Sequence, residues 1–210
     1  LQIIPDGIYV DVTFGGGGHS KAILEKLKDG KLYAFDQDED AWKNEVVDER
    51  FVLLKKNFSL LRESLKEQGV EQVDGILADL GVSSHQFDVP DRGFSTRFDA
   101  RLDMRMDQQA KLDAAEVVSY FDEPSLKDIF STYGEVENAG LLAKKIVAAR
   151  KEKKIDTVEA LKEIMKTCVR RGRENQYYAQ VFQALRIEVN KEMDVLKKML
   201  TQSLDVLKPG

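Results

Sequence analysis

Four consecutive glycines, residues 15–18, stand between a short apolar segment and a polar segment that opens with His19 and Ser20. Glycine has no Cβ, so a glycine turn can adopt positive φ and bring its backbone close to a ligand. The first N–H groups of a helix have no partner inside the helix and can point at a polar ligand. A strand, a glycine loop and a helix in this order predict a nucleotide-cofactor loop.

A carboxylate follows this loop at a spacing that suits ribose binding. Roughly 20 residues beyond the glycines, the apolar segment 32–35 ends at Asp36, where an acidic residue can bind ribose hydroxyls. The loop does not match G-x-G-x-x-G, because the third glycine would fall at Ser20 or Lys21. This mismatch favours a mononucleoside cofactor over a dinucleotide. A tight turn without a ligand is the structural alternative.

Asp79 is the candidate for chemistry, because it closes the apolar run 73–80 just before a polar segment that contains His85 and Gln86. The exocyclic amine of a base is a weak nucleophile. A carboxylate that accepts its N–H increases its electron density and holds it in line with a methyl donor. If the reaction is transfer of a methyl group to such an amine, Asp79 is the residue placed to assist it. We expect His19 to contact cofactor or substrate, and neither histidine has a second ligand at metal spacing.

These residues fall at the ends of predicted strands. Strands are predicted at 8–12, 32–36, 51–55 and 73–80, with helices between them at 21–27, 39–46 and 60–68. This alternation predicts an α/β sheet of parallel strands covered by helices. Ligands bind beyond the carboxyl ends of such strands, where residues 15–18, Asp36, Phe58 and Asp79 are all expected.

Residues 81–107 have little periodicity, and a loop of this length is usually functional or disordered. The segment interleaves aromatic residues with arginines: Phe87, Arg92, Phe94, Arg97, Phe98, Arg101 and Arg105. Planar rings and guanidinium groups suit stacking on bases and contact with phosphates. The alternative is a loop that folds back and places its aromatic residues in the core.

The rest of the chain has helical periodicity. Short helices are predicted at 114–120, 125–132, 137–151 and 157–167, followed by one long helix at 176–200. We expect residues 1–108 and 176–210 to form the cofactor-binding domain and residues 109–175 to form a helical insert. The basic runs 151–154 and 170–173 are expected to be solvated helix ends, with contact to RNA phosphates as the alternative.

Composition narrows the class of protein. The 210 residues carry a net charge of −5, which argues against indiscriminate coating of nucleic acid. No apolar run is long enough to cross a bilayer, so no membrane partner is expected. The single cysteine, Cys168, cannot form an internal disulfide and is expected to be a buried structural residue. Its isolation favours a reducing compartment, the cytoplasm.

Five blocks of the sequence together resemble the bacterial S-adenosylmethionine-dependent 16S ribosomal RNA cytosine-N4 methyltransferases. The blocks are D-V-T-F-G-G-G-G-H-S at 11–20, D-L-G-V-S-S at 79–84, R-G-F-S at 92–95, L-D-M-R-M-D at 102–107 and F-Q-A-L-R-I at 182–187. The resemblance implies a class I, Rossmann-like methyltransferase sheet with an inserted all-helical domain. It also implies methylation of the N4 amine of a cytosine in the decoding region of the small ribosomal subunit.

The resemblance further implies S-adenosylmethionine as cofactor and 16S rRNA within the small subunit as partner. Cofactor contacts are carried over to seven residues: Gly17, Gly18, His19, Asp36, Phe58, Asp79 and Gln86. Asp36 would bind the ribose hydroxyls, Phe58 would lie near the adenine, and Asp79 would lie nearest the reacting amine. The helical insert would recognise RNA, and residues 92–107 would form an RNA-facing or lid segment.

Some features depart from the family pattern. Arg101 stands where the family usually has proline, and the family continues at both ends with segments that this sequence lacks, so we expect a truncated chain. Two other functions remain open at this point. One is a nicotinamide or flavin oxidoreductase on the same kind of sheet, and the other is a cofactor- or ribosome-binding fragment without turnover.

Overall fold

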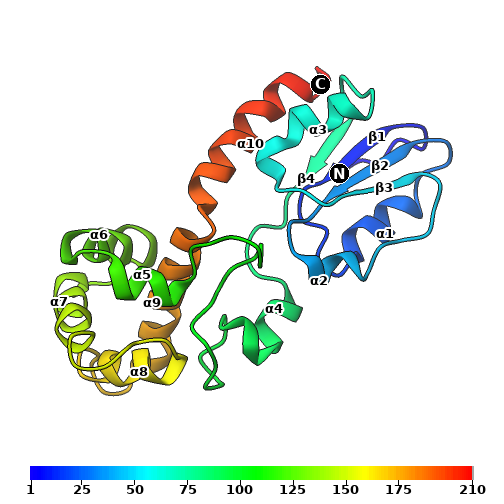
Figure 1. Cartoon of the computed structure of the whole chain (residues 1–210). Coiled ribbons are helices and arrows are strands. Elements are labelled where there is room, and N and C mark those ends of the chain that lie inside the picture. Colours follow the sequence, from blue (N-terminus) through cyan, green and yellow to red (C-terminus); the bar gives the residue numbers. More distant parts are fainter. Residues whose placement is uncertain (210) are drawn as a thin grey trace. The chain divides into compact units, whose positions relative to one another are not determined.

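The computed structural model describes residues 1–209 and divides into two compact units. The sheet unit consists of Leu1–Ser83 and Met193–Gly210, and the helical unit consists of Ser84–Glu192. Figure 1 labels the elements of both units. In sequence, the helical unit lies between two segments of the sheet unit.

The boundaries between the units differ from the predicted ones. They fall at 83/84 and 192/193 instead of 108/109 and 175/176. Leu102 and Met104 are fully buried, and the Leu102 N–H donates to the Asp156 carbonyl over 2.9 Å. The segment that follows residue 83 therefore packs with the helices and belongs to their unit.

The sheet has four parallel strands in the order β3-β2-β1-β4. Their bounds are Ile8–Asp11 (β1), Lys31–Phe35 (β2), Phe51–Leu54 (β3) and Gly75–Leu77 (β4). The chain runs outward from β1 to β2 and β3, then crosses to the other side of β1 to form β4. The order of the strands reverses between β1 and β4, which is where ligands bind in open α/β sheets. The predicted α/β, Rossmann-like sheet is confirmed, with β4 shorter than expected.

Alternate residues of each strand build two separate cores, one on each face of the sheet. On β2, Tyr33 and Phe35 pack with α3 (Leu61–Glu67) and α10 (Glu192–Val206), whereas Leu32 and Ala34 pack on the opposite face. That face is covered by α1 (Gly18–Leu24), together with the short α2 (Glu39–Trp42). Figure 1 shows α3 beside α10 on one side of the sheet and α1 on the other. Burial on both faces explains why most residues of the strands are apolar.

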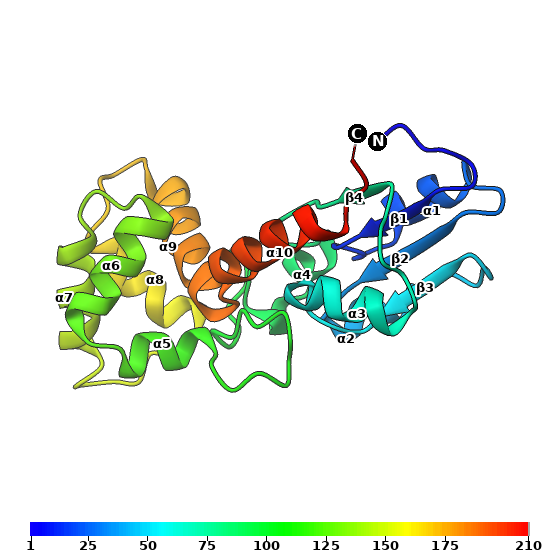
Figure 2. The ribbon, with the colours of Figure 1, turned by 90° about the horizontal axis from the view of Figure 1, so that it is seen from above.

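The helical unit is built around α9, Glu174–Val189. Its other long elements are α5 (Ala114–Tyr120), α6 (Glu123–Gly134), α7 (Ala139–Ala149) and α8 (Val158–Lys166). Figure 2 shows α6 and α8 next to α9, and α7 packs against α6. Side chains define the helix starts: Asp113 and Glu116 form a capping box on α5, and Thr157 caps α8.

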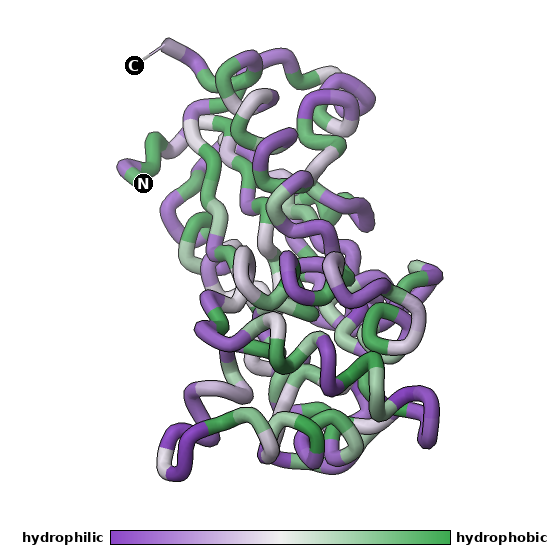
Figure 3. The backbone as a smooth tube through the Cα atoms, turned by 90° about the vertical axis from the view of Figure 1, so that its left-hand side faces the viewer, coloured by the Kyte–Doolittle hydropathy of each residue, from purple (hydrophilic) through white to green (hydrophobic). Residues whose placement is uncertain are grey.

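Hydrophobic and hydrophilic residues alternate at short intervals along the helices, as Figure 3 shows. This is the pattern of helices that bury one face against neighbours and expose the other. Within residues 1–209, no helix has both the length and the apolar sequence that are needed to cross a membrane.

Segment 81–107 is more ordered than the sequence suggested. It contains α4 (Ser84–Asp88) and the 3-10 helix η2 (Pro90–Arg92). Phe94 is buried, whereas Phe87 and Phe98 each remain 39% exposed. The fold-back alternative therefore holds for Phe94, and base stacking remains open only to the two exposed rings.

The single long helix predicted at 176–200 is wrong. α9 ends at Val189 and α10 begins at Glu192, because Lys191 adopts a left-handed φ of 50°. The Asn190 amide donates to the Met104 carbonyl over 2.8 Å and its Oδ1 accepts the Met106 N–H over 2.7 Å. These contacts with a segment distant in sequence favour the break, so helical periodicity alone could not reveal it.

Candidate functional site

The glycine loop joins β1 to α1 and exposes part of its backbone. Gly15 and Gly17 have positive φ values of 50° and 75°, and Gly17 is the N-cap of α1. A Cβ on Gly17 would lie 3.1 Å from the Phe14 ring. In contrast, a Cβ on Gly16 or Gly18 would meet no atom within 4 Å. These two glycines therefore leave open space over the loop, into which a ligand can approach the backbone.

The helix begins earlier than predicted, at Gly18, so His19 and Ser20 lie in its first turn. The fully buried carboxylate of Asp11 holds this turn in place. It accepts the Thr13 N–H over 3.0 Å and the Ser20 hydroxyl over 2.8 Å. Sequence reasoning assigned no role to Asp11, although a carboxylate inside an apolar strand was a signal for one.

Asp36 follows the last residue of β2, as predicted, and is tied to the glycine loop. Its Oδ2 accepts the Gly15 N–H over 2.8 Å and its Oδ1 accepts the Asp38 N–H over 2.9 Å. Burial raises the pKa of Asp36, and these two N–H groups oppose the rise only in part. Each carboxylate oxygen keeps a further lone pair, so the side chain can still accept ribose hydroxyls.

Two further residues, which the sequence did not reveal, support the backbone at Asp36 and Gly15. The Trp42 indole N–H donates to the Asp36 carbonyl over 3.0 Å, and the Asn44 amide donates to the Gly15 carbonyl over 3.1 Å. Both contacts use backbone acceptors and connect α2 and the residues after it to the loop. No local motif marks such residues, because their role depends on the tertiary fold.

Asp79 and His19 meet where the strand order reverses. The Asp79 Oδ2 lies 3.3 Å from the His19 Nε2, and the two side chains are 72% and 58% exposed. The Asp79 N–H donates to the Thr13 hydroxyl over 2.8 Å, which fixes the backbone beside the glycine loop. Asp79 lies two residues beyond β4, in the loop and not in the strand where it was predicted. The result is an exposed carboxylate held next to the loop.

The two remaining residues predicted to contact the cofactor lie in different units. Phe58 begins the 3-10 helix η1 (Phe58–Leu60) after β3 and packs, partly buried, against the sheet core. It therefore follows the carboxyl end of its strand, as expected. Gln86 lies on α4 of the helical unit, where its side chain is buried. Its contact with a cofactor stays a prediction. Cys168 is half-buried, so the prediction that it is buried was only partly right.

The groups of this site fit a nucleoside that carries a positive charge. Open glycine backbone, the partly buried Asp36 and the exposed Asp79 lie in one unit. Carboxylates repel a pyrophosphate but attract a sulfonium cation. In the described part of the chain, no three His, Cys, Asp or Glu side chains are placed to hold a metal ion. S-adenosylmethionine, a ribonucleoside with a sulfonium, has the groups that this site can bind.

Known proteins with similar sequences cover this chain from end to end. "Ribosomal RNA small subunit methyltransferase H" of Flavobacterium johnsoniae is 58% identical over 211 residues, which is 100% of this chain and 70% of that protein. The protein of the same name from Cytophaga hutchinsonii is 53% identical over 212 residues, which is 100% of this chain and 71% of the relative.

A solved structure of a putative methyltransferase from an antibiotic biosynthesis pathway of Anabaena variabilis is 12% identical and covers 97% of this chain and 87% of its own. Its TM-score of 0.31 is too low to establish a shared fold.

The sequence matches, in contrast, favour a methyltransferase over a nicotinamide or flavin oxidoreductase. A sequence profile described as the MraW methylase family matches residues 1–210. With the glycine loop, Asp36 and Asp79 placed as they are, this chain belongs to the MraW methylase family.

Proposed function

We propose that this protein transfers a methyl group from S-adenosylmethionine to the N4 amine of a cytosine in the 16S rRNA of the small ribosomal subunit. The observation that carries the proposal is the exposed Asp79 carboxylate, held 3.3 Å from His19 beside the open glycine loop. The relatives named as small-subunit rRNA methyltransferases support the choice of RNA. The cytosine and its N4 amine come from the resemblance of the five sequence blocks.

Several residues of the sheet unit would hold S-adenosylmethionine. Gly17 would shape the turn through its positive φ, and the exposed Gly18 would let the cofactor approach the backbone. Asp36 would accept the ribose hydroxyls, and Phe58 lies at the same edge of the sheet for the adenine. The cofactor supplies a methyl carbon on a positively charged sulfur. Asp36 and Asp79 place negative charge around that cation, which favours binding.

Asp79 acts on the amine. One carboxylate oxygen accepts an N–H of the amine, which increases electron density on the nitrogen and restricts its orientation. When the nitrogen–carbon bond forms and the carbon–sulfur bond breaks, the nitrogen must lose one proton. Asp79 accepts this proton and releases it to solvent, because its side chain is 72% exposed. His19 positions the carboxylate through its hydrogen bond.

We assign RNA recognition to the helical unit, residues 84–192. This unit presents exposed guanidinium and aromatic groups: Arg97 lies 4.8 Å from the Phe87 ring centroid and 5.9 Å from that of Phe98. Such groups stack on unpaired bases. Gln86, on the same unit, is proposed as a further contact with the cofactor.

Methylation of purified small subunits tests the proposal. The 210-residue chain is incubated with subunits that lack the modification and with S-adenosylmethionine carrying a labelled methyl group. Mass spectrometry of the digested rRNA should show labelled N4-methylcytidine. Label on another base or another position of cytosine would contradict the proposed substrate, and binding of NAD in preference to S-adenosylmethionine in a calorimetric titration would contradict the cofactor.

A further inference from the structure

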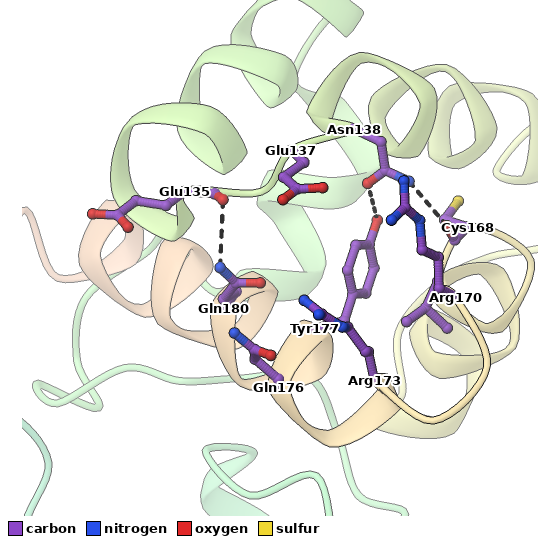
Figure 4. Close-up of a pocket in the computed structure, with 10 residues that line it drawn as sticks. Glu135, Glu137, Asn138, Cys168, Arg170, Arg173, Gln176, Tyr177 and Gln180 are labelled. Carbon is purple, nitrogen blue, oxygen red and sulfur yellow. Dashed lines mark hydrogen bonds between the residues drawn. The ribbon is translucent and has the colours of Figure 1, made fainter.

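A pocket of about 340 Å³ lies entirely within the helical unit, away from the glycine loop in sequence. Its walls come from the α6–α7 connection, the α8–α9 connection and the first two turns of α9. The lining residues that matter here are Glu137, Asn138, Arg170, Arg173, Tyr177 and Gln180. Figure 4 shows these side chains around the Tyr177 ring. The volume lies in the range of small-ligand pockets, about 300–1,000 Å³.

The arginines at this pocket differ from the others of the protein. Eight of the eleven arginines bind a carboxylate, a hydroxyl or a backbone carbonyl. Across residues 1–209, Arg170, Arg171 and Arg173 are the three whose side chains make neither a hydrogen bond nor an ion pair, and all three are exposed. A guanidinium offers five N–H donors in a planar fork that matches phosphate. Unpaired guanidinium groups beside a pocket therefore favour an anionic ligand.

The floor of the pocket is fixed by hydrogen bonds. The buried Tyr177 hydroxyl donates to the Asn138 Oδ1 over 2.8 Å, and the Asn138 amide donates to the Cys168 carbonyl over 2.9 Å. Burial raises the pKa of Tyr177, so the hydroxyl stays protonated and keeps this bond at neutral pH. A floor that is ordered in advance lowers the entropy cost of binding.

The pocket also contains a hydrogen-bond acceptor. In Figure 4 the Glu137 carboxylate points toward the space beside Tyr177, whereas the Glu135 carboxylate points away from it. An ionised carboxylate accepts hydrogen bonds and cannot donate. Free phosphate gains nothing from Glu137 and is repelled by it. A ligand that carries both a phosphate and N–H donors satisfies both sides of the pocket.

We propose that this pocket binds one nucleotide of the RNA, with its phosphate on Arg170 and Arg173 and an N–H-bearing base edge on Glu137. Proteins that read RNA sequence commonly bind single unstacked nucleotides by their base edges. The inference deepens the proposed function and rests on it, because it assumes an RNA substrate. It assigns a second contact point for that RNA, separate from the reacting base.

Binding of a short single-stranded RNA to the full chain, followed by fluorescence anisotropy at fixed salt, tests the phosphate contact. The variant Arg170→Gln/Arg173→Gln is compared with Lys151→Gln/Lys153→Gln, which removes the same charge from exposed lysines of the same unit. We expect about tenfold weaker binding for the first variant and less than twofold for the second. The plot of the logarithm of the RNA association constant against the logarithm of the salt concentration should also become less steep, by about 0.7 in slope for each lost phosphate contact. Equal losses in both variants, or no loss in either, would overturn the proposal.

Competition experiments test the base contact. Cytidine 5′-monophosphate, guanosine 5′-monophosphate, cytidine and inorganic phosphate each compete with the labelled RNA. The mononucleotides should compete at least tenfold better than cytidine or phosphate alone, and Glu137→Gln should change the preference between the two nucleotides. Equal competition by inorganic phosphate would mean a simple anion site and would overturn the nucleotide assignment.

Binding of S-adenosylmethionine separates failure of this inference from failure of the proposed function. The arginine variant should bind the cofactor with the wild-type Kd, because the glycine loop and Asp36 are unchanged. If the wild-type chain binds RNA through the pocket but methylates no cytosine, the proposed function fails and the pocket stands. If the wild-type chain methylates rRNA and the arginine variant binds RNA as well as wild type does, the pocket fails alone.

Discussion

At the scale of single residues, carboxylates shape the glycine loop before any ligand binds. Asp11 joins the end of β1 to the start of α1 through Thr13 and Ser20. Asp36 holds the Gly15 N–H. Because these side chains already satisfy backbone groups of the loop, little ordering remains when the cofactor arrives, which favours affinity.

The pKa of Asp36 sets the pH dependence of cofactor binding. The ionised carboxylate accepts ribose hydroxyls, so affinity is high above its folded pKa and is lost as the pH falls through it. Burial raises this pKa above 3.8, so the loss begins at higher pH than for an exposed aspartate. The contribution of Asp36 to the stability of the free protein depends on pH in the opposite direction. Because its pKa is raised on folding, it stabilises the protein below the unfolded pKa, and this stabilisation is lost as the pH rises through the folded pKa.

Calorimetric titration with S-adenosylmethionine from about pH 4 to about pH 8 checks this expectation. Asp36→Asn should weaken binding roughly 10- to 100-fold at neutral pH, since a hydrogen bond to a charged group contributes about 1.5–3 kcal/mol. The variant should also lose most of the pH dependence over the acidic part of this range. An unchanged pH profile in the variant would show that another group controls binding.

Asp79 should affect catalysis more than cofactor binding. We expect Asp79→Asn to lower kcat about 100-fold, which is the size of effect seen when one aligned polar group is removed from a transition state. The Kd for S-adenosylmethionine should change less than this. Asp205→Asn, which alters a carboxylate of the sheet unit whose side chain is 50% exposed, serves as the control and should retain activity. A kcat for Asp79→Asn within about twofold of wild type would exclude a role for the carboxylate in methyl transfer.

At the scale of elements, two neighbouring glycines should have different effects when they are replaced. Gly17 has a φ of 75°, and a Cβ there would lie 3.1 Å from the Phe14 ring. Gly17→Ala should therefore destabilise the protein by about 1–2 kcal/mol and weaken cofactor binding. Gly18 is the first residue of α1, and a Cβ there would meet nothing within 4 Å. Gly18→Ala should leave stability equal or up to about 1 kcal/mol higher but obstruct the ligand.

Urea unfolding and cofactor titration of both variants separate the fold from the ligand contact. The decisive result is Gly18→Ala: a stable protein with at least tenfold weaker cofactor binding supports close approach of the ligand to the loop. Normal cofactor binding by a stable Gly18→Ala protein would show that the ligand lies elsewhere.

The break between α9 and α10 depends on Asn190. Its side chain binds the Met104 carbonyl and the Met106 N–H, and Met104 itself has a φ of 63°. Asn190→Ala should leave these half-buried backbone groups without their partners and cost about 1–3 kcal/mol in urea unfolding. Asn175→Ala, at an exposed position of α9, is the control. Equal stability of the two variants would show that Asn190 does not hold the segment.

Sequence reasoning predicted the elements whose signals are local. Each strand, the glycine loop and Asp36 follow from apolar runs, from glycine and from spacing along the chain. The break at Asn190 and Lys191, the ordering of Met104 and the supporting contacts of Trp42 do not, because each depends on hydrogen bonds between residues far apart in sequence. Asp11 could have been found, since a carboxylate within a buried strand needs polar partners.

At the scale of the whole molecule, the charges are distributed unequally. The helical unit contains 19 acidic and 19 basic residues, whereas the sheet unit contains 18 acidic and 13 basic residues. The net charge of −5 therefore belongs to the sheet unit. A negative sheet unit repels RNA in general while favouring a cationic cofactor. RNA is then expected to bind at a few basic side chains of the helical unit that have no ion-pair partner. Such local binding explains how an acidic protein can act on a polyanion.

Hydrogen exchange of the whole chain with and without S-adenosylmethionine tests how far the cofactor's influence reaches. At about 100 times its Kd, the ligand stabilises the folded state by about 2.7 kcal/mol, so amides that exchange only by opening the bound unit should slow about 100-fold. We expect this protection in β1, α1 and β2. If Gln86 contacts the cofactor, α4 is protected as well although it belongs to the helical unit. Helices α7 and α8, to which no cofactor contact is assigned, serve as internal controls. Protection of the sheet unit without α4 would remove Gln86 from the site, and protection centred on α7 and α8 would contradict cofactor binding at the glycine loop.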